Sequence, residues 1–155
     1  MAKNLKVHFS SKNDSWETPQ DLFNEINKTY GPFQLDPASS DTNTKCPIWF
    51  TEDQDGLKQD WHVFGKVFCN PPYSNVGDWL KKGYEESQKG CRVVMLVPAR
   101  TDTKAFHNYA MKAARIHLIK GRLKFSGSKN SAPFPSMIVV FEQGNYLPMV
   151  LSWNK

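Results

Sequence analysis

The first apolar residues with helical spacing lie near the N-terminal end of the chain. Over residues 19–28 the side chains of Leu22 and Ile26 share one face, which predicts a short amphipathic helix. Thr18 is the expected N-terminal cap of this helix, and Pro19 occupies its first position, where a missing N–H costs nothing. Residues 1–15 are polar and predict a loose arm that precedes the domain.

Further along the chain, short runs of consecutive apolar residues alternate with segments whose apolar residues have helical spacing. The run over residues 92–97 is almost continuously apolar, as expected of a strand buried on both faces of a parallel sheet. The polar residues 39–60 predict a long loop with little regular structure, and such loops usually carry function. The remaining expected elements are strands at 33–35, 66–69, 116–119, 136–142 and 146–151, and helices at 75–88 and 103–114.

Alternating strands and helices predict an α/β fold with helices on both faces of the sheet. We expect a compact Rossmann-like arrangement, mostly parallel, with an antiparallel C-terminal strand pair. Ligands in such sheets bind beyond the carboxyl ends of the strands. Asp36, Asn70 and the segment 98–100 each follow a predicted strand, so the pattern places a ligand site among them.

Composition and charge narrow the class of protein. The 155 residues fit one domain, which we place at 16–155, and the net charge of +5 favours a partner with a phosphate backbone. No apolar run approaches the roughly 20 residues of a membrane span, and the first residues lack the apolar stretch of a signal peptide. A cytoplasmic protein is therefore expected. The three cysteines form no Cys-x-x-Cys pair, and no metal site is expected.

The tetrapeptide Asn70-Pro71-Pro72-Tyr73 follows a predicted strand and precedes a predicted helix. An exocyclic amine on a base is a poor nucleophile because its lone pair is delocalised into the ring. Two acceptors that bond both amine hydrogens can turn the lone pair towards a methyl donor, and the Asn70 side chain and the Pro71 carbonyl can supply them. The two prolines fix these acceptors in advance, and Tyr73 offers a ring on which a flipped base can stack.

Other chemistries find no support in the sequence. There is no Gly-x-x-x-x-Gly-Lys-Ser/Thr phosphate loop, so nucleotide hydrolysis is not expected. Methylation of cytosine at C5 needs a thiolate, but Cys69 lies within a predicted strand and no Pro-Cys dipeptide occurs. The four histidines show no pairing with an acid or thiol that suggests a catalytic triad.

With these motifs in this order, the chain resembles the phage-type DNA N6-adenine methyltransferase family, often called phage Dam. The resemblance runs in family order from about residue 16 to 142 and includes an acidic motif, the tetrapeptide and a basic segment. The matching segments are 16–19, 35–39, Asn43, 55–57, Trp61, 68–73, 96–103, 121–125 and 132–134. The resemblance implies methyl transfer from S-adenosylmethionine to adenine N6 in double-stranded DNA, and an origin in a phage or prophage acting in a bacterial host.

The resemblance also implies roles for individual residues. The catalytic group is Asn70, Pro71, Pro72 and Tyr73. The residues expected to bind the cofactor are Trp16, Thr18, Pro19, Asp36, Pro37 and Ala38, with either Asp55 or Asp60. One departure concerns the turn after Asp36, because residues 38–41 contain no glycine where amino-methyltransferases usually have a glycine-rich turn.

DNA contacts are expected from cations around the ligand edge. The expected residues are the five cations Arg100, Lys104, Arg122, Lys124 and Lys129, together with the aromatic Phe125. Phe125 has two possible places: it can enter the duplex or stack on a base, or it can belong to the core. Two alternatives to the main hypothesis stay open at this stage. They are an S-adenosylmethionine-dependent methyltransferase acting on a protein glutamine or an RNA base, and a DNA-binding protein with a decayed cofactor pocket.

Overall fold

The computed structural model describes residues 16–154, so the predicted arm at 1–15 lies outside the described residues. The helices are α2 (Gln20–Tyr30), α3 (Val76–Ser87) and α4 (Lys104–Asn108). The strands are β1 (Leu35–Asp36), β2 (Ile48–Trp49), β3 (Lys66–Cys69), β4 (Arg92–Pro98), β5 (Arg115–Ile119), β6 (Ser136–Phe141) and β7 (Met149–Trp153). Four 3₁₀ turns lie at Gly56–Lys58, His62–Phe64, Tyr73–Asn75 and Ala110–Lys112. Within 16–154 no helix has the length and apolar character that crossing a membrane requires.

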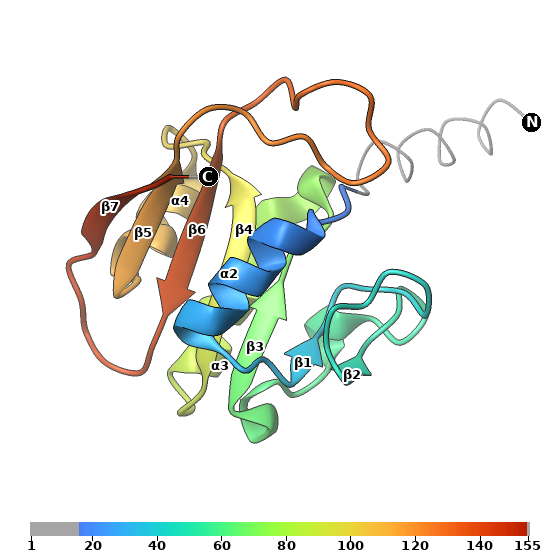
Figure 1. Cartoon of the computed structure of the whole chain (residues 1–155). Helices are drawn as coiled ribbons and strands as arrows, with labels where there is room; N and C mark the ends of the chain where they lie inside the picture. The colour runs from blue at the N-terminus through green and yellow to red at the C-terminus, as the bar shows by residue number, and fades with distance from the viewer. Residues whose placement is uncertain (1–15, 155) are drawn as a thin grey trace, which may run out of the picture.

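One seven-stranded sheet has the order β2-β1-β3-β4-β6-β5-β7 (Figure 1). The β2–β1–β3–β4 pairs and the β5–β7 pair are parallel, and β6 runs antiparallel to both of its neighbours, β4 and β5. The mostly parallel α/β sheet with antiparallel pairing towards the C-terminal end confirms the predicted fold class.

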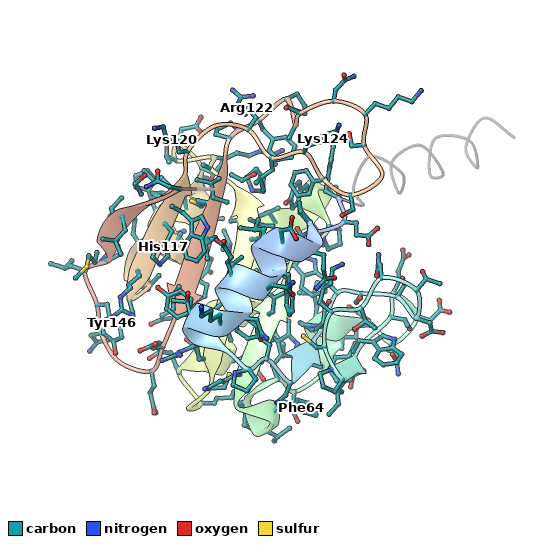
Figure 2. The ribbon with its side chains drawn as sticks, viewed as in Figure 1. Phe64, His117, Lys120, Arg122, Lys124 and Tyr146 are labelled. Atoms are coloured by element: carbon teal, nitrogen blue, oxygen red, sulfur yellow. The ribbon has the colours of Figure 1, made fainter. Side chains whose placement is uncertain are left out.

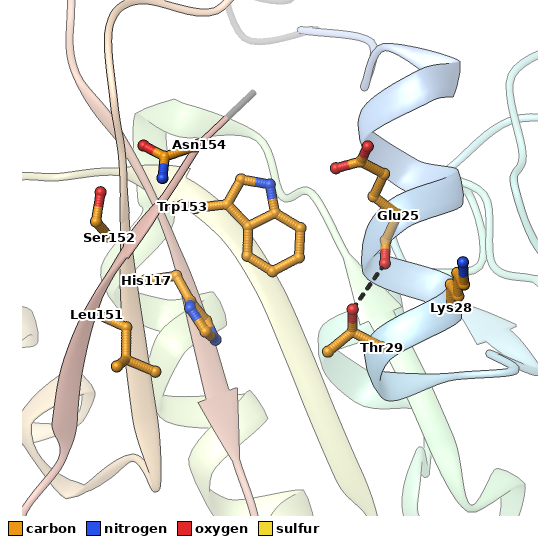
Figure 3. Close-up of a pocket in the computed structure, with 8 residues that line it drawn as sticks. All are labelled: Glu25, Lys28, Thr29, His117, Leu151, Ser152, Trp153 and Asn154. Carbon is orange, nitrogen blue, oxygen red and sulfur yellow. Dashed lines mark hydrogen bonds between the residues drawn. The ribbon is translucent and has the colours of Figure 1, made fainter.

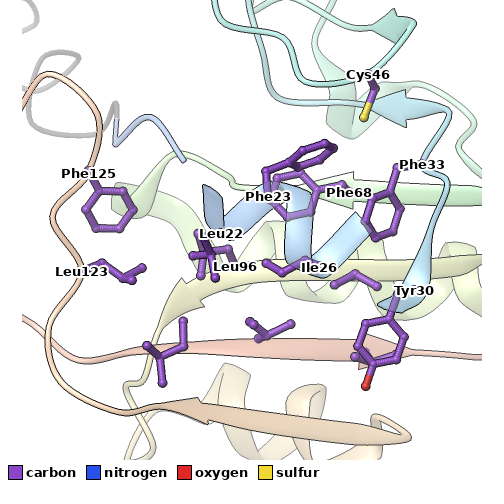
Figure 4. Close-up of a cluster of buried hydrophobic side chains, with 14 of the residues drawn as sticks. Leu22, Phe23, Ile26, Tyr30, Phe33, Cys46, Phe68, Leu96, Leu123 and Phe125 are labelled. Carbon is purple, nitrogen blue, oxygen red and sulfur yellow. The ribbon is translucent and has the colours of Figure 1, made fainter. Parts of the chain in front are cut away.

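Alternating side chains of the sheet build one apolar layer on each face. In β4, Val94 and Leu96 pack in the layer under α2, whereas Val93 and Met95 pack in the layer under α3. Figure 4 shows the α2 layer, in which Ile26 lies against the sheet. The continuous apolar run of β4 is explained by this burial on both faces.

The structure corrects the expected elements at their ends. Thr18 does not cap α2 with its side chain; Pro19 holds the N-cap position, and the Thr18 hydroxyl instead accepts a hydrogen bond from Asn70. The helix expected over 103–114 ends at Asn108, because the fully buried Ala110 draws the chain into a tight turn. The last strand begins at Met149 and not at 146, directly after Pro148, which cannot donate to a ladder.

The loop at 39–60 is mostly irregular, as expected, although it contains the short strand β2. Asn43 fixes the turn after β1, because its Oδ1 accepts hydrogen bonds from the Ser39 hydroxyl (3.0 Å) and from the backbone N–H of Ser40 (3.0 Å). Side-chain bonds of this kind stand in for the glycine-rich turn that the segment lacks.

Candidate active site

Three parallel strands end at one edge of the sheet. β1 ends at Asp36, β3 ends just before Asn70, and β4 ends at Pro98. From β1 the chain goes outwards to β2 and then returns to the other side of β1 as β3. The crevice between β1 and β3 is therefore a topological switch point, the place where open α/β sheets bind ligands.

Asn70 is held from the N-terminal side of α2. Its Nδ2 donates to the Thr18 hydroxyl at 2.9 Å and to the backbone oxygen of Trp16. Its Oδ1 is buried and has no hydrogen-bond partner among the described residues. The amide is thus fixed through its nitrogen, and its oxygen is the acceptor left over for a ligand.

The prolines after Asn70 keep the backbone extended. Pro72 has φ −59° and ψ 134°, and the 3₁₀ turn that leads into α3 starts directly after it. Pro71 is buried and Pro72 is half-buried. Pro72 has no backbone N–H, and its ring restricts the backbone after the Pro71 carbonyl. The turn that holds Asn70 therefore also fixes the orientation of this carbonyl.

Tyr73 lies in a cluster of four aromatic rings. Its ring centroid is 5.4 Å from that of Phe134 and 6.4 Å from that of Phe125, and Trp16 lies 5.4 Å from each of these two. The Tyr73 hydroxyl is buried with no partner among the described residues. Burial raises the pKa of this hydroxyl well above its ordinary value. Arg100 donates to the backbone oxygen of Tyr73 at 3.4 Å, which ties β4 to the tetrapeptide.

Phe125 belongs to the core, which is the second of the two possibilities that the sequence left open. It is 2% exposed and packs in the α2 layer. A ring covered in this way cannot stack on DNA from the surface, and we correct its expected contact with DNA to a packing role beside Tyr73.

Asp36 is a buried carboxyl group, 5% exposed. Burial raises its pKa to about 6, and hydrogen bonds from Ala38, Ser39 and Lys45 with the nearby charge of Lys45 partly oppose this. The bond from the Ala38 N–H to Oδ1 is long, at 3.4 Å. A buried carboxylate with weak partners has acceptor capacity for the N–H or O–H groups of a ligand.

The loop after β2 packs against the Asp36 segment through Gly56. A Cβ on Gly56 would lie 2.0 Å from the backbone oxygen of Pro37, so only glycine allows this approach. The indole N–H of Trp61 donates to the Gly56 oxygen at 2.8 Å and holds the loop in place. Asp55 precedes this contact and bonds the Leu57 N–H at 3.2 Å.

Asp60 lies elsewhere. It is exposed, and one of its carboxylate oxygens lies within 4.8 Å of a ring nitrogen of His62 and a carboxylate oxygen of Glu86. The sequence left Asp55 and Asp60 open as the second acid of the cofactor site. Asp55 adjoins Gly56, which lies against Pro37, whereas Asp60 lies beside His62 and Glu86.

Five of the expected DNA-binding residues are exposed cations around the same edge. Arg100 and Lys104 follow β4, and Arg122, Lys124 and Lys129 lie on residues 120–135, here called the edge loop. Figure 2 labels Arg122 and Lys124 on this loop. The edge loop joins β5 to β6 and bonds back to the N-terminal segment, since the Ser126 N–H donates to the Glu17 oxygen at 3.0 Å.

A surface hollow between α2 and β7 is separate from this edge (Figure 3). It is lined by Glu25, Lys28, Thr29, His117, Leu151, Ser152, Trp153 and Asn154. None of the residues predicted for the site belongs to it.

Sequence reasoning missed the contacts that hold the site together. The contact of Thr18 with Asn70 spans 52 positions, and Phe134 reaches Tyr73 from the edge loop. Only Phe134 gave a signal, as part of the segment 132–134 on which the family resemblance rests; nothing in the local pattern pairs Thr18 with Asn70.

Comparisons with known proteins identify the family of the chain. The family model described as DNA N-6-adenine-methyltransferase (Dam) matches residues 6–152. A protein named DNA N-6-adenine-methyltransferase from Escherichia phage T1 is 32% identical over 110 residues, which cover 71% of this chain and 46% of that protein. A protein of the same name from Haemophilus phage HP1 is 30% identical over 141 residues, covering 85% of this chain and 80% of that protein. The chain thus spans about half the length of the T1 relative.

Among solved structures, a Listeria monocytogenes protein described as a class I S-adenosylmethionine-dependent methyltransferase is similar, with a TM-score of 0.47 and 17% identity. The match covers 84% of this chain and 52% of that one. This similarity is too low to carry an inference about function.

Proposed function

The chain belongs to the Dam family of DNA N-6-adenine-methyltransferases, and on this basis we propose that it transfers a methyl group from S-adenosylmethionine to N6 of an adenine flipped out of double-stranded DNA. The observation that carries the proposal is the Asn70 amide, fixed through its nitrogen with a buried, unpartnered oxygen at the switch point of the sheet.

Asn70 Oδ1 and the Pro71 carbonyl accept hydrogen bonds from the two hydrogens of the adenine amine. This draws electron density onto the nitrogen and turns its lone pair out of the plane of the ring. A new N–C bond to the methyl group forms as the old S–C bond breaks, and the nitrogen then gives one proton to solvent water. The products are N6-methyladenine and S-adenosylhomocysteine, and preorganised acceptors supply much of the rate.

The residues near Asp36 fit S-adenosylmethionine. When bound, this cofactor supplies a methyl group activated by a positively charged sulfur. The buried carboxylate of Asp36 would accept hydrogen bonds from its N–H or O–H groups. Pro37 and Ala38 would form the wall beside it, and Asp55 is the favoured second acid, because it adjoins Gly56, whose backbone lies against the Pro37 carbonyl. Trp16, Thr18 and Pro19 close this side of the crevice.

Tyr73 is the proposed stacking partner of the flipped base. In this structure its ring is 5% exposed, covered by Phe125 and Phe134. The base therefore enters as the edge loop that carries these two rings moves away from Tyr73. The same loop presents Arg122, Lys124 and Lys129, so contact of the loop with phosphates and opening of the base site are coupled in this proposal.

Single-molecule sequencing tests the proposal. The full chain is expressed in a bacterial host without adenine methylation of its own, in parallel with Asn70→Ala. We expect N6-methyladenine at one short sequence with the unchanged chain and none with Asn70→Ala. Unmodified DNA from cells that contain folded protein able to bind S-adenosylmethionine would contradict the proposal and favour the non-catalytic alternative.

A further inference from the structure

Ser136 opens β6 at the edge where the candidate active site lies. Because β6 runs antiparallel to β4, its first residue pairs with Pro98, the last residue of β4. Side chains alternate along a strand, and Ile138 of β6 packs in the α2 layer, which also contains Tyr73. Ser136 therefore projects from the same face of the sheet as Tyr73.

Asn70 belongs to that face as well. Phe68 packs in the α2 layer, and Asn70 follows it by two positions and bonds to Thr18 before α2. β3 and β6 are separated by one strand, β4, which puts the two strands about 10 Å apart at the usual spacing. Ser136 is level with Pro98, two residues beyond the position of β4 next to Asn70, so the two residues lie about 12 Å apart. A base with a hydrogen bond at each end spans a gap of this size.

The hydroxyl of Ser136 is buried and without a partner among the described residues. The residue is 2% exposed, and its Oγ makes no hydrogen bond there. A buried polar group left unpaired costs about 1–3 kcal/mol, so such groups are uncommon without a reason. Asn70 Oδ1 and the Tyr73 hydroxyl are in the same condition at the same edge.

We propose that the Ser136 hydroxyl donates a hydrogen bond to a ring nitrogen of the target adenine, and so helps to select and orient this base. The inference rests on the proposed function. Adenine presents its amino group as a donor and its free ring nitrogens as acceptors. Asn70 supplies the acceptor for the amino group, and a hydroxyl two strands away supplies the complementary donor. Two attachment points stop the base from turning about Asn70 and keep its amine in line with the methyl group.

Deaza analogues of adenine provide the test. Four duplexes carry the recognition site found by sequencing, with adenine or its 1-deaza, 3-deaza or 7-deaza analogue at the target position. In each analogue a C–H replaces one ring nitrogen, so one acceptor is lost while the amine remains. Rates are measured with the unchanged chain, with Ser136→Ala and with Ser87→Ala. Ser87 is the matched control, a buried serine whose hydroxyl bonds the Tyr84 oxygen at 2.6 Å on α3.

We expect the unchanged chain to methylate one analogue about 3–10-fold more slowly than adenine, the effect of one neutral hydrogen bond. Ser136→Ala should slow methylation of adenine by a similar factor and lose its discrimination against that analogue. Comparing the two proteins on the same analogue cancels any change in the intrinsic reactivity of the amine. Ser87→Ala should keep the rates and the discrimination of the unchanged chain.

Two results would overturn the assignment of Ser136. One is an unchanged rate on adenine in Ser136→Ala. The other is a slower variant that discriminates among the analogues as the unchanged chain does, which indicates a purely structural role. Failure of the proposed function looks different, because the unchanged chain would then methylate none of the four duplexes.

Discussion

Two groups of buried polar side chains in this protein differ in how completely their hydrogen bonds are made. Glu86, on α3, is almost wholly buried, and its carboxylate bonds the backbone N–H groups of Trp61 and His62 as well as the Lys89 ammonium at 2.7 Å. At the carboxyl edge of the sheet, Asn70 Oδ1 and two hydroxyls have no partner among the described residues. The first group has its hydrogen bonds made within the protein, whereas the second has hydrogen-bonding capacity left for a ligand.

The pKa of Glu86 reflects the number of hydrogen bonds that its carboxylate accepts. Burial by itself would raise it, but the hydrogen bonds from Lys89, from the Trp61 N–H and from His62 lower it to about 2. Burial raises the pKa of Asp36, whose partners are weaker, to about 6. Both carboxyl groups are almost inaccessible to solvent, but Asp36 is embedded more deeply and has weaker partners, so its pKa rises whereas that of Glu86 falls.

The comparison predicts its largest effect at Asn70. Asn70→Ala should lower kcat by about 10²–10³-fold, by analogy with the loss of one preorganised donor from an oxyanion hole. The affinity for S-adenosylmethionine should stay nearly unchanged, because Asn70 is assigned to the adenine amine. Single-turnover kinetics and calorimetry measure the two quantities separately. Turnover close to that of the unchanged chain would remove Asn70 from the catalytic group.

Glu86→Ala should lower the stability of the fold and leave the rate of methyl transfer nearly unchanged. The backbone N–H groups of Trp61 and His62 lose their acceptor, and at about 1–3 kcal/mol for each unpaired group we expect a loss of about 3 kcal/mol. For a chain of this size that corresponds to a drop in Tm of roughly 9 °C. Thermal unfolding measures it, and the rate per folded molecule should remain within about twofold. A specific loss of kcat with unchanged Tm would reverse the roles that we assign to the two groups.

The parts of the fold that the sequence predicts well are those with a strong apolar period. The run in β4 and the stripe of Leu22 and Ile26 in α2 have the burial that their patterns indicate. The tetrapeptide at 70–73 and Asp36 also lie at the expected edge, because the ends of parallel strands coincide.

The contacts that complete the site could not be predicted in the same way. Thr18 was expected to cap a helix, which is the commonest local use of threonine before a helix, but a tertiary contact with Asn70 takes its hydroxyl. Phe125 stands between polar residues, and only the folded edge loop turns it inwards. Such contacts depend on the path of loops, which leaves no period in the sequence.

Asp36→Asn should have opposite effects on stability and on binding. The pKa of Asp36 is about 6 in the folded protein against an ordinary value of 3.8, so the folded state holds the proton more tightly. Its contribution to stability is fully present below about pH 4 and is lost as the pH rises to about 6, by about 3 kcal/mol in total.

Unfolding of Asp36→Asn between pH 4 and 8 is the corresponding measurement. The variant should be more stable than the unchanged chain above pH 6 and should lack this part of the pH dependence. Its affinity for S-adenosylmethionine should fall, and the unchanged chain should lose affinity as the pH drops below about 6. Unchanged affinity in the variant would leave Asp36 with a structural role only.

The smallest expected effect concerns the cations of the edge loop, which are exposed, unlike the two buried groups. If Lys124 contacts a phosphate, Lys124→Ala should reduce the slope of log affinity against log salt by about 1 and weaken binding to all DNA sequences alike. Replacing Lys129 as well should reduce the slope by about 1 more. Lys81→Ala is a matched control, because Lys81 is an exposed lysine on α3 and not on the edge loop. Binding to duplex DNA at several salt concentrations gives the slope directly. An unchanged slope in the double variant would mean that DNA approaches the active-site edge from a side other than the edge loop, and the coupling between phosphate contact and opening at Tyr73 would then be wrong.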